Sequence, residues 1–171
     1  ALNNIYAITR RNKDQEAGKA LVKLSELMRY VIYDSNVNEI RLSWELEHVD
    51  NYLEVGRLKF SKEDKLDIRL RKQGNFREYK IAPLLLIPFV ENALKHGLSS
   101  TGTGYIHIDV QIKDSELNFR IENPILGKGE SLKKHPGIGL DNVKKRLELL
   151  YPGRHALKIL ASEGKFMVDL S

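Results

Sequence analysis

The sequence predicts an α+β fold, in which helices come first and a mixed β-sheet covered by helices on one face follows. Apolar residues recur at alternating spacings of four and three in residues 17–31 and 46–56, as in helices that pack in a bundle. One amphipathic helix is predicted at Pro83–Gly97. Apolar and polar residues alternate, as half-buried strands require, in residues 66–70, 106–112 and 117–121.

The composition indicates one folded domain, or a modest domain with a helical segment. The chain has 171 residues, and its hydrophobic share of 42% supports a packed core. Its longest apolar run, Ile81–Val90, contains two prolines and is shorter than the ~20 residues of a membrane-spanning helix. The absence of cysteine excludes disulfides and thiolate metal sites and fits a reducing compartment. We therefore expect a cytoplasmic location.

The net charge is weak support for a polyanionic partner. It amounts to +5, from 28 Lys and Arg against 23 Asp and Glu, and the two signs are interspersed. A nucleic-acid module would show a basic stripe with interleaved stacking aromatics. Basic residues instead lie in separate loops or at segment ends, as Lys72, Arg77, Lys80, Lys133 and Lys134 do. We expect no nucleic-acid partner.

Three helices are expected ahead of the sheet. Residues 1–12 indicate the end of one helix, and Asp14–Tyr33 a second. A third is expected to start near Ser43, a suitable N-cap. The apolar seams over residues 17–31 and 42–53 predict a homodimer. Because the chain starts inside a helical pattern and without Met, we expect a fragment of a longer protein.

The helix predicted at Pro83–Gly97 has two chemically different faces. Asn92, Lys95 and His96 share one face. An Asn oxygen suits Mg²⁺ and a Lys ammonium suits phosphate, so this face is suited to a metal-bound polyphosphate. Taken alone, such a trio is more often a solvated helix face that ends at a glycine C-cap. The opposite, core-facing side is expected to hold Leu86, Val90, Ala93 and Leu94.

A second candidate for anion binding follows residue 136. Gly137 and Gly139 permit a close backbone approach, and a helix starting at Leu140 or Asp141 would direct free N–H groups at an anion. A lone G-x-G before a helix is as often only a turn. The preceding residues, 124–136, lose the hydrophobic rhythm and predict a lysine-bearing lid. No P-loop motif and no H-R-D or D-F-G set is present.

These segments resemble motifs of one known family. VENALKHG and GIGLDNVKKRLELLY resemble the N box and second glycine box of the GHKL ATP-binding fold, as found in LytS-like bacterial sensor histidine kinases. LSWELEHVDNYLEVGRLKF resembles the segment between their dimerisation helices and ATP domain. The resemblance implies a GHKL (Bergerat) two-layer α/β sandwich with a mixed sheet, preceded by a helical dimerisation segment. Residues 1–63 would form that segment and residues 64–171 the ATP-binding catalytic domain.

The resemblance also implies a set of site residues. Asn92 resembles the N-box Asn that holds Mg²⁺, with Lys95 and His96 nearby for phosphate contacts. Gly137 and Gly139 resemble the glycines of the phosphate loop. The other nucleotide contacts that it implies in and after that loop are Ile138, Leu140, Asn142 and Arg146. Asn92 and Lys95 are the expected catalytic residues.

Two positions depart from common patterns of the fold. Asn123 stands where the first glycine box usually has an Asp that accepts a hydrogen bond from the adenine amino group, and Pro124-Ile125 replaces the usual Asn-Gly. An Asn carbonyl can still accept that bond. Pro88 stands four residues before Asn92, where GHKL ATPases place an acidic residue that activates water. Its lack of a carboxylate favours transfer to a histidine over hydrolysis.

The implied function is that of the catalytic portion of a two-component sensor histidine kinase using ATP and Mg²⁺. In the family the phosphoacceptor His directly precedes the A-L-N-N with which this chain begins, so the acceptor is expected upstream of Ala1. The chain alone is then expected to be inactive as an autokinase. The phosphoryl group would pass on to an Asp of a response regulator receiver domain, and the parent protein is expected to be membrane-anchored upstream.

Two other functions stay open at this point. The altered first glycine box is compatible with a non-catalytic nucleotide-sensing or protein-interaction module. A GHKL ATPase is the second alternative, which Pro88 disfavours. Mg²⁺-dependent ATP binding would separate the first from a kinase, and steady hydrolysis without phosphoprotein would favour the ATPase.

Overall fold

The computed structural model describes residues 37–58, 60, 64–99, 103–125, 138–162 and 164–171, together with Val22 and Ser25, which are both helical. Two compact units interleave along the chain. The N-terminal unit comprises Ala1–Asp64 and Arg77–Ile87, and the sheet unit comprises Lys65–Phe76 and Pro88–Ser171. The expected helix over residues 1–12, most of the helix at Asp14–Tyr33 and most of the expected lid lie outside the described residues.

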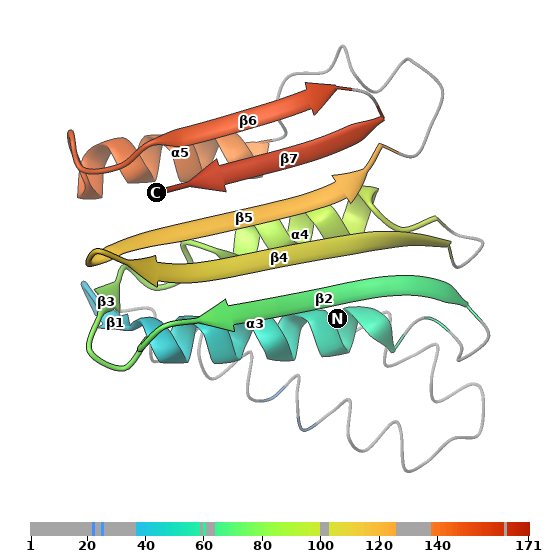
Figure 1. Cartoon of the computed structure of the whole chain (residues 1–171), viewed down its shortest axis with the longest axis horizontal. Helices are drawn as coiled ribbons and strands as arrows, with labels where there is room; N and C mark the ends of the chain where they lie inside the picture. The colour runs from blue at the N-terminus through green and yellow to red at the C-terminus, as the bar shows by residue number, and fades with distance from the viewer. Residues whose placement is uncertain are drawn as a thin grey trace. The chain divides into compact units, whose positions relative to one another are not determined.

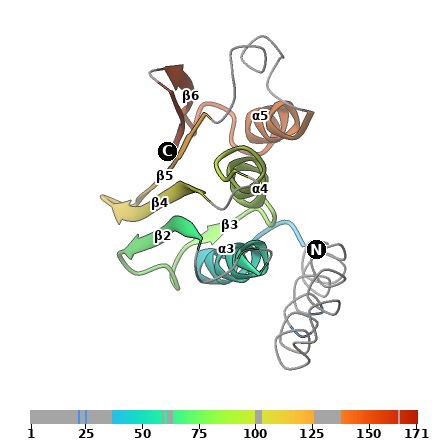
Figure 2. The same ribbon diagram turned by 90° about the vertical axis from the view of Figure 1, so that its right-hand side faces the viewer.

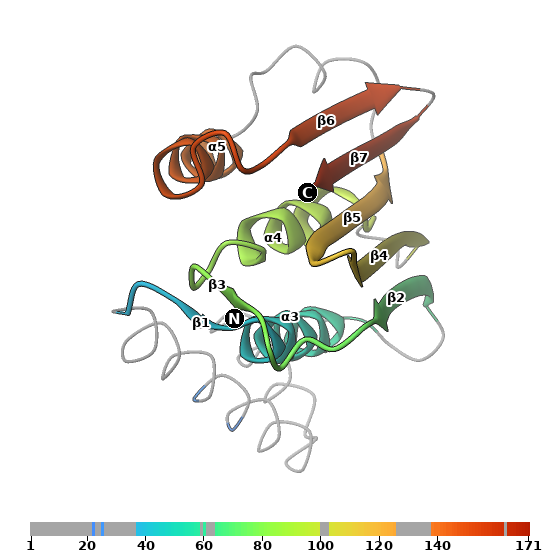
Figure 3. The ribbon, with the colours of Figure 1, turned by 60° about the vertical axis from the view of Figure 1, so that its left-hand side comes forward.

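The described part of the N-terminal unit is a helix held beside a small strand pair. Strand β1 (Ile40–Arg41) runs directly into α3 (Leu42–Arg57), and β3 (Lys80–Ile81) pairs with β1 in antiparallel fashion. Figure 3 shows both strands beside the start of α3. The pairing joins two segments of the chain that lie about 40 residues apart, through Ile40 opposite Ile81.

The start of α3 differs from the prediction, because Ser43 is not its N-cap. The helix begins at Leu42, and the N-cap residue Arg41 is extended and makes no side-chain cap. The Leu42 N–H donates instead to the Tyr79 carbonyl at 2.8 Å. An N–H in the first turn has no partner within the helix. The Tyr79 carbonyl, just before β3, therefore supplies the hydrogen-bond acceptor that a serine side chain would have supplied at the N-cap.

The predicted apolar seam of α3 exists, but it is covered within the chain. Leu46, Val49 and Leu53 are 1%, 0% and 3% exposed. The expectation that residues 42–53 offer this seam to a second copy is therefore wrong. A dimer would have to use other surfaces, and residues 17–31 lie almost entirely outside the described residues.

The sheet unit contains the predicted mixed sheet. Figure 1 shows its strands in the order β2-β4-β5-β7-β6. Strand β2 is parallel to β4, and all other neighbours are antiparallel. The strands are β2 (Lys65–Gln73), β4 (Thr103–Lys113), β5 (Glu116–Pro124), β6 (Leu157–Ser162) and β7 (Lys165–Leu170). The fold class predicted from the alternating pattern is confirmed.

Helices α4 (Ile87–His96) and α5 (Ile138–Leu150) cover one face of this sheet (Figure 2). The rings of Phe89 on α4 and Phe119 on β5 lie with their centroids 5.9 Å apart. The predicted core residues of α4 are all at most 7% exposed: Leu86, Val90, Ala93 and Leu94. The apolar residues of the sheet that are buried are Ile68, Ile106, Ile108, Val110, Phe119, Ile121, Val168 and Leu170.

The bounds of both helices differ from the prediction. Helix α4 begins at Ile87 and not at Pro83, because Leu84 has a φ of 57°, a left-handed conformation that a helix does not accept. Helix α5 begins at Ile138, two residues earlier than the earliest predicted start. Leu150 is 47% exposed, because it is the last residue of α5 and the chain turns there.

Candidate functional site

Helix α4 presents the predicted polar trio away from its buried side. Asn92 is half-buried, while Lys95 and His96 are exposed in the last turn. Ala93 and Leu94, on the core side, are buried. An amide, an ammonium and an imidazole therefore stand together on a firmly packed helix.

The surroundings of His96 favour the neutral form of its imidazole at physiological pH. Partial burial lowers the pKa of His96 below its usual value of 6.5, and the positive charge of Lys95 lowers this pKa further. A neutral imidazole keeps one donor and one acceptor nitrogen. Lys95 is thus the positively charged group of this trio.

The end of α4 touches strand β5 through a glycine. A Cβ added at Gly97 would lie 2.6 Å from Cβ of Asn123 and 2.8 Å from the Ala93 carbonyl oxygen. The absence of a side chain therefore allows the helix end to approach the strand this closely. The sequence suggested only a C-cap role for Gly97, because no local pattern reveals which strand lies behind it.

Asn123 is the buried polar residue at this junction. It is 1% exposed, and its Nδ2 donates to the Pro124 carbonyl at 3.0 Å. Its Oδ1 is buried and accepts no hydrogen bond within the part of the chain that the structure describes. Because the Nδ2 bond fixes the orientation of the amide, Oδ1 is the atom left for a donor. A buried acceptor without a partner costs on the order of 1–3 kcal/mol, so a ligand donor there would be favoured.

The start of α5 provides a second, backbone-based group of donors. The first N–H groups of a helix lack intrahelical partners and carry its positive end. A Cβ added at Gly139 would meet no heavy atom within 4 Å, so the packing of the described residues does not require this glycine. Leu140 is 4% exposed and anchors the helix start. The space beside Gly139 therefore suits a close approach by a ligand.

The remaining predicted residues are only partly described. Asn142 is exposed and Arg146 is half-buried on α5, further from the helix start. Gly137 and the side chain of Ile138 lie outside the described residues. The structure thus brings Asn123 against Gly97, which directly follows His96 at the end of α4, and places α5 on the same face of the sheet as α4 (Figure 2).

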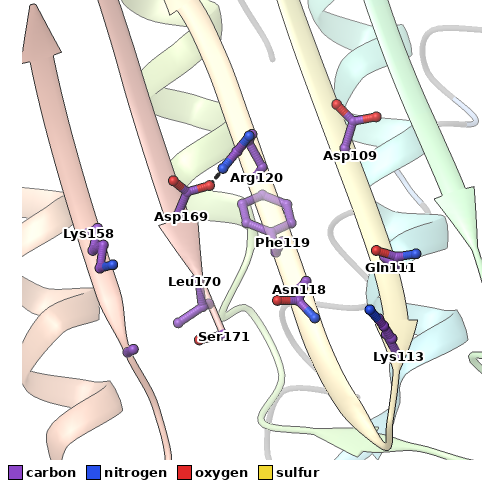
Figure 4. Close-up of a pocket in the computed structure, with 11 residues that line it drawn as sticks. Asp109, Gln111, Lys113, Asn118, Phe119, Arg120, Lys158, Asp169, Leu170 and Ser171 are labelled. Carbon is purple, nitrogen blue, oxygen red and sulfur yellow. Dashed lines mark hydrogen bonds and ion pairs between the residues drawn. The ribbon is translucent and has the colours of Figure 1, made fainter.

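A shallow cavity of about 570 Å³ lies on the opposite face of the sheet (Figure 4). It is bounded by polar residues such as Gln111 and Lys113, and Arg120 forms an ion pair with Asp169 across it. None of the predicted site residues lines this cavity. The side chains around the cavity belong to the polar surface of the sheet. The sheet itself separates this cavity from the candidate site on the helix side.

Comparisons with known proteins find similarity to histidine kinases. A family model described as "Histidine kinase" matches residues 1–65. Sensor protein LytS of Oceanobacillus iheyensis is 31% identical over 169 residues, which cover 91% of this chain and 28% of that protein. Over most of its length the chain is similar to LytS-like sensor histidine kinases. Sensor histidine kinase BtsS of Escherichia coli is 29% identical over 173 residues, covering 97% of this chain and 29% of the relative. This chain thus spans less than a third of the length of the histidine kinases that it matches.

Solved structures support the same fold. The catalytic domain of histidine kinase ThkA superposes with a TM-score of 0.54 at 16% identity, over 77% of this chain and 91% of that domain. Acinetobacter baumannii histidine kinase AdeS gives 0.53 at 15% identity, over 93% and 79%. In the described part of the chain, no helix has the length and apolar character needed to cross a membrane.

Proposed function

We propose that this chain binds Mg²⁺-ATP and acts as the catalytic region of a two-component sensor histidine kinase. The observation that carries the proposal is the buried Oδ1 of Asn123, which has no donor in the described structure and lies beside the end of α4. The exocyclic amino group of adenine is a donor that would satisfy it. Asn123 thus takes the role that an Asp has in related sequences.

The residues around Asn123 suit the rest of the nucleotide. Asn92 would hold Mg²⁺ through its amide oxygen, Lys95 would contact phosphate, and the N–H groups at the start of α5 would receive phosphate oxygens. Bound Mg²⁺ would supply neutralisation of the charge that develops on the transferred phosphoryl group. His96, with its lowered pKa, would act as a neutral hydrogen-bonding partner.

Transfer to a histidine fits the site better than hydrolysis does. Pro88, in the first turn of α4, has no group that can activate water. A neutral imidazole attacks through its own lone pair and needs no such base. We propose that the acceptor is a histidine outside these 171 residues, that the phosphoryl group then passes to an Asp of a response regulator, and that the kinase works as a cytoplasmic homodimer.

Base selectivity tests the adenine contact directly. We expect the chain to bind ATP about tenfold more tightly than inosine triphosphate, because inosine replaces the donating amino group with an acceptor and one hydrogen bond is worth about 1 kcal/mol or more. Asn123→Asp should keep this preference, because a carboxylate also accepts. Asn123→Leu, similar in size, should remove it. Equal binding of both nucleotides by the unmodified chain would contradict the proposal.

A further inference from the structure

Helix α3 carries a carboxylate that is fully enclosed in the protein. Glu45 is 0% exposed and is the only buried acidic residue among those the structure describes. Its Oε2 accepts a hydrogen bond from the Leu84 N–H at 2.9 Å, and its Oε1 accepts one from the Leu86 N–H at 2.9 Å. Each oxygen thus binds a backbone amide about 40 residues further along the chain.

The turn that Glu45 binds has an unusual backbone. Leu84 has a φ of 57°, a conformation that non-glycine residues avoid. The surrounding structure must therefore hold it, and the two hydrogen bonds that one carboxylate accepts from the backbone do so on both sides of Leu85. The same segment is also held by the pairing of β1 with β3. Residues 40–45 consequently fix residues 79–86 at several points.

The same carboxylate stands at the start of α4. Leu86 directly precedes Ile87, the first residue of α4, and the first turn of this helix has no acidic residue of its own. Negative charge near a helix N-terminus is favourable, because unpaired N–H groups and the helix dipole make that end positive. Glu45 therefore supplies from α3 the acidic group that the first turn of α4 lacks.

We infer that Glu45 is a positioning residue for the nucleotide site, which fixes the start of α4 and through it the placement of Asn92. The inference rests on the proposed binding of Mg²⁺-ATP. Helix α4 begins at the turn that Glu45 holds and carries Asn92 one and a half turns later, whereas Asn123 sits on strand β5. A change at Glu45 should therefore disturb the contact with Mg²⁺ and leave the contact with adenine intact.

Nucleotide binding measured in two ways separates these contacts. For the unmodified chain and for Glu45→Gln, the affinity for ATP is titrated with Mg²⁺ and with EDTA, and the affinity for inosine triphosphate with Mg²⁺. Gln keeps the size of Glu but loses the charge and one acceptor. We expect the gain in affinity from Mg²⁺ to fall about tenfold, within the usual range of coupling between sites, while the preference for ATP over inosine triphosphate is unchanged.

The matched control is Glu47→Gln, which removes an exposed carboxylate from the same helix two residues away. This control should leave unchanged both the ratio of ATP affinities with and without Mg²⁺ and the ratio of affinities for ATP and inosine triphosphate. Equal loss of both ratios in Glu45→Gln would indicate general disruption and overturn the inference, as would no loss of either. If the unmodified chain shows no Mg²⁺-dependent ATP binding, the proposed function itself fails, and the role of Glu45 fails with it.

A measurement on the unmodified chain covers the case in which Glu45→Gln does not fold. Coupling between two sites is reciprocal, so occupancy of the site by Mg²⁺-ATP should slow the hydrogen exchange of the Leu84 and Leu86 amides. We expect about tenfold slower exchange with Mg²⁺-ATP than with ATP and EDTA. Unchanged exchange of both amides on saturation with Mg²⁺-ATP would show that the turn and the metal contact are independent.

Discussion

His96 links the candidate site to the pH dependence of stability. Burial and the charge of Lys95 lower its pKa in the folded chain below 6.5, so the unfolded chain binds this proton more readily. The stability of the folded state should therefore fall as the pH falls below about 6.5. His96→Gln does not titrate and should lose less stability over that interval.

Urea unfolding at about pH 8 and about pH 5 measures this effect as a difference between the two proteins, in which the titration of other groups largely cancels. Lys95→Gln is the control, because removal of the second cause should shrink the difference without abolishing it. An equal loss of stability in the unmodified chain and in His96→Gln would contradict the assigned pKa direction.

At the scale of residues, the sequence predicted the polar trio on α4 because helical periodicity alone determines which residues share a face. It could not reveal that the Oδ1 of Asn123 lacks a partner, since that depends on how the amide is oriented by the Pro124 carbonyl. Glu45 was also missed. Nothing in a helical pattern distinguishes a carboxylate that binds backbone amides 40 residues away from one on a solvated face.

At the scale of elements, two glycines should respond to substitution in opposite ways. Gly97→Ala should destabilise the fold by about 1–3 kcal/mol, because its Cβ would overlap Cβ of Asn123 and the Ala93 carbonyl at the end of α4. Gly139→Ala should leave stability unchanged or raise it by up to ~1 kcal/mol, since its Cβ would meet open space at the start of α5. Yet Gly139→Ala should weaken ATP binding, because that space is where we place the phosphates.

Urea unfolding and ATP titration of the two variants test this pair. The proposed phosphate approach at α5 would be wrong if Gly139→Ala bound ATP as tightly as the unmodified chain. Full stability of Gly97→Ala would show that the end of α4 can shift away from β5 at little cost.

The sequence predicted the existence and type of α3, α4, α5, β2, β4 and β5, but not the two-residue strands β1 and β3. The ends of the predicted helices depended on distant parts of the chain. The start of α3 is set by the Tyr79 carbonyl, and the start of α4 by the left-handed Leu84 that Glu45 binds. The strands between residues 103 and 124 were predicted well because alternation and a short turn are local signals. That turn has left-handed Asp114 and Ser115, as tight hairpins require.

At the scale of the whole molecule, binding and phosphoryl transfer should separate. We expect the 171-residue chain to bind ATP and to form no acid-labile, base-stable phosphohistidine, because we propose that the acceptor is a histidine other than the five in this chain. A longer natural chain that includes the preceding sequence should form one. Incubation of both chains with γ-labelled ATP measures this, with Asn92→Ala in the longer chain as the control.

Label on the 171-residue chain would identify one of its own histidines as the acceptor. The absence of label on the longer chain, despite ATP binding, would favour a non-catalytic nucleotide sensor. Both outcomes differ from a failure of the chain to bind ATP, which would contradict the proposed nucleotide site itself.

The interleaving of the two compact units limits how such a region can be recombined with others. The chain leaves the N-terminal unit after Asp64 and returns to it for Arg77–Ile87. A chimaeric kinase joined between residues 63 and 64 would therefore pair the Glu45 and Ile40 of one parent with the turn and the β3 strand of the other. A junction placed before residue 37 keeps these partners together. Exchange of signalling modules, in evolution or in the laboratory, should accordingly be tolerated best when residues 37–171 all come from the same parent protein.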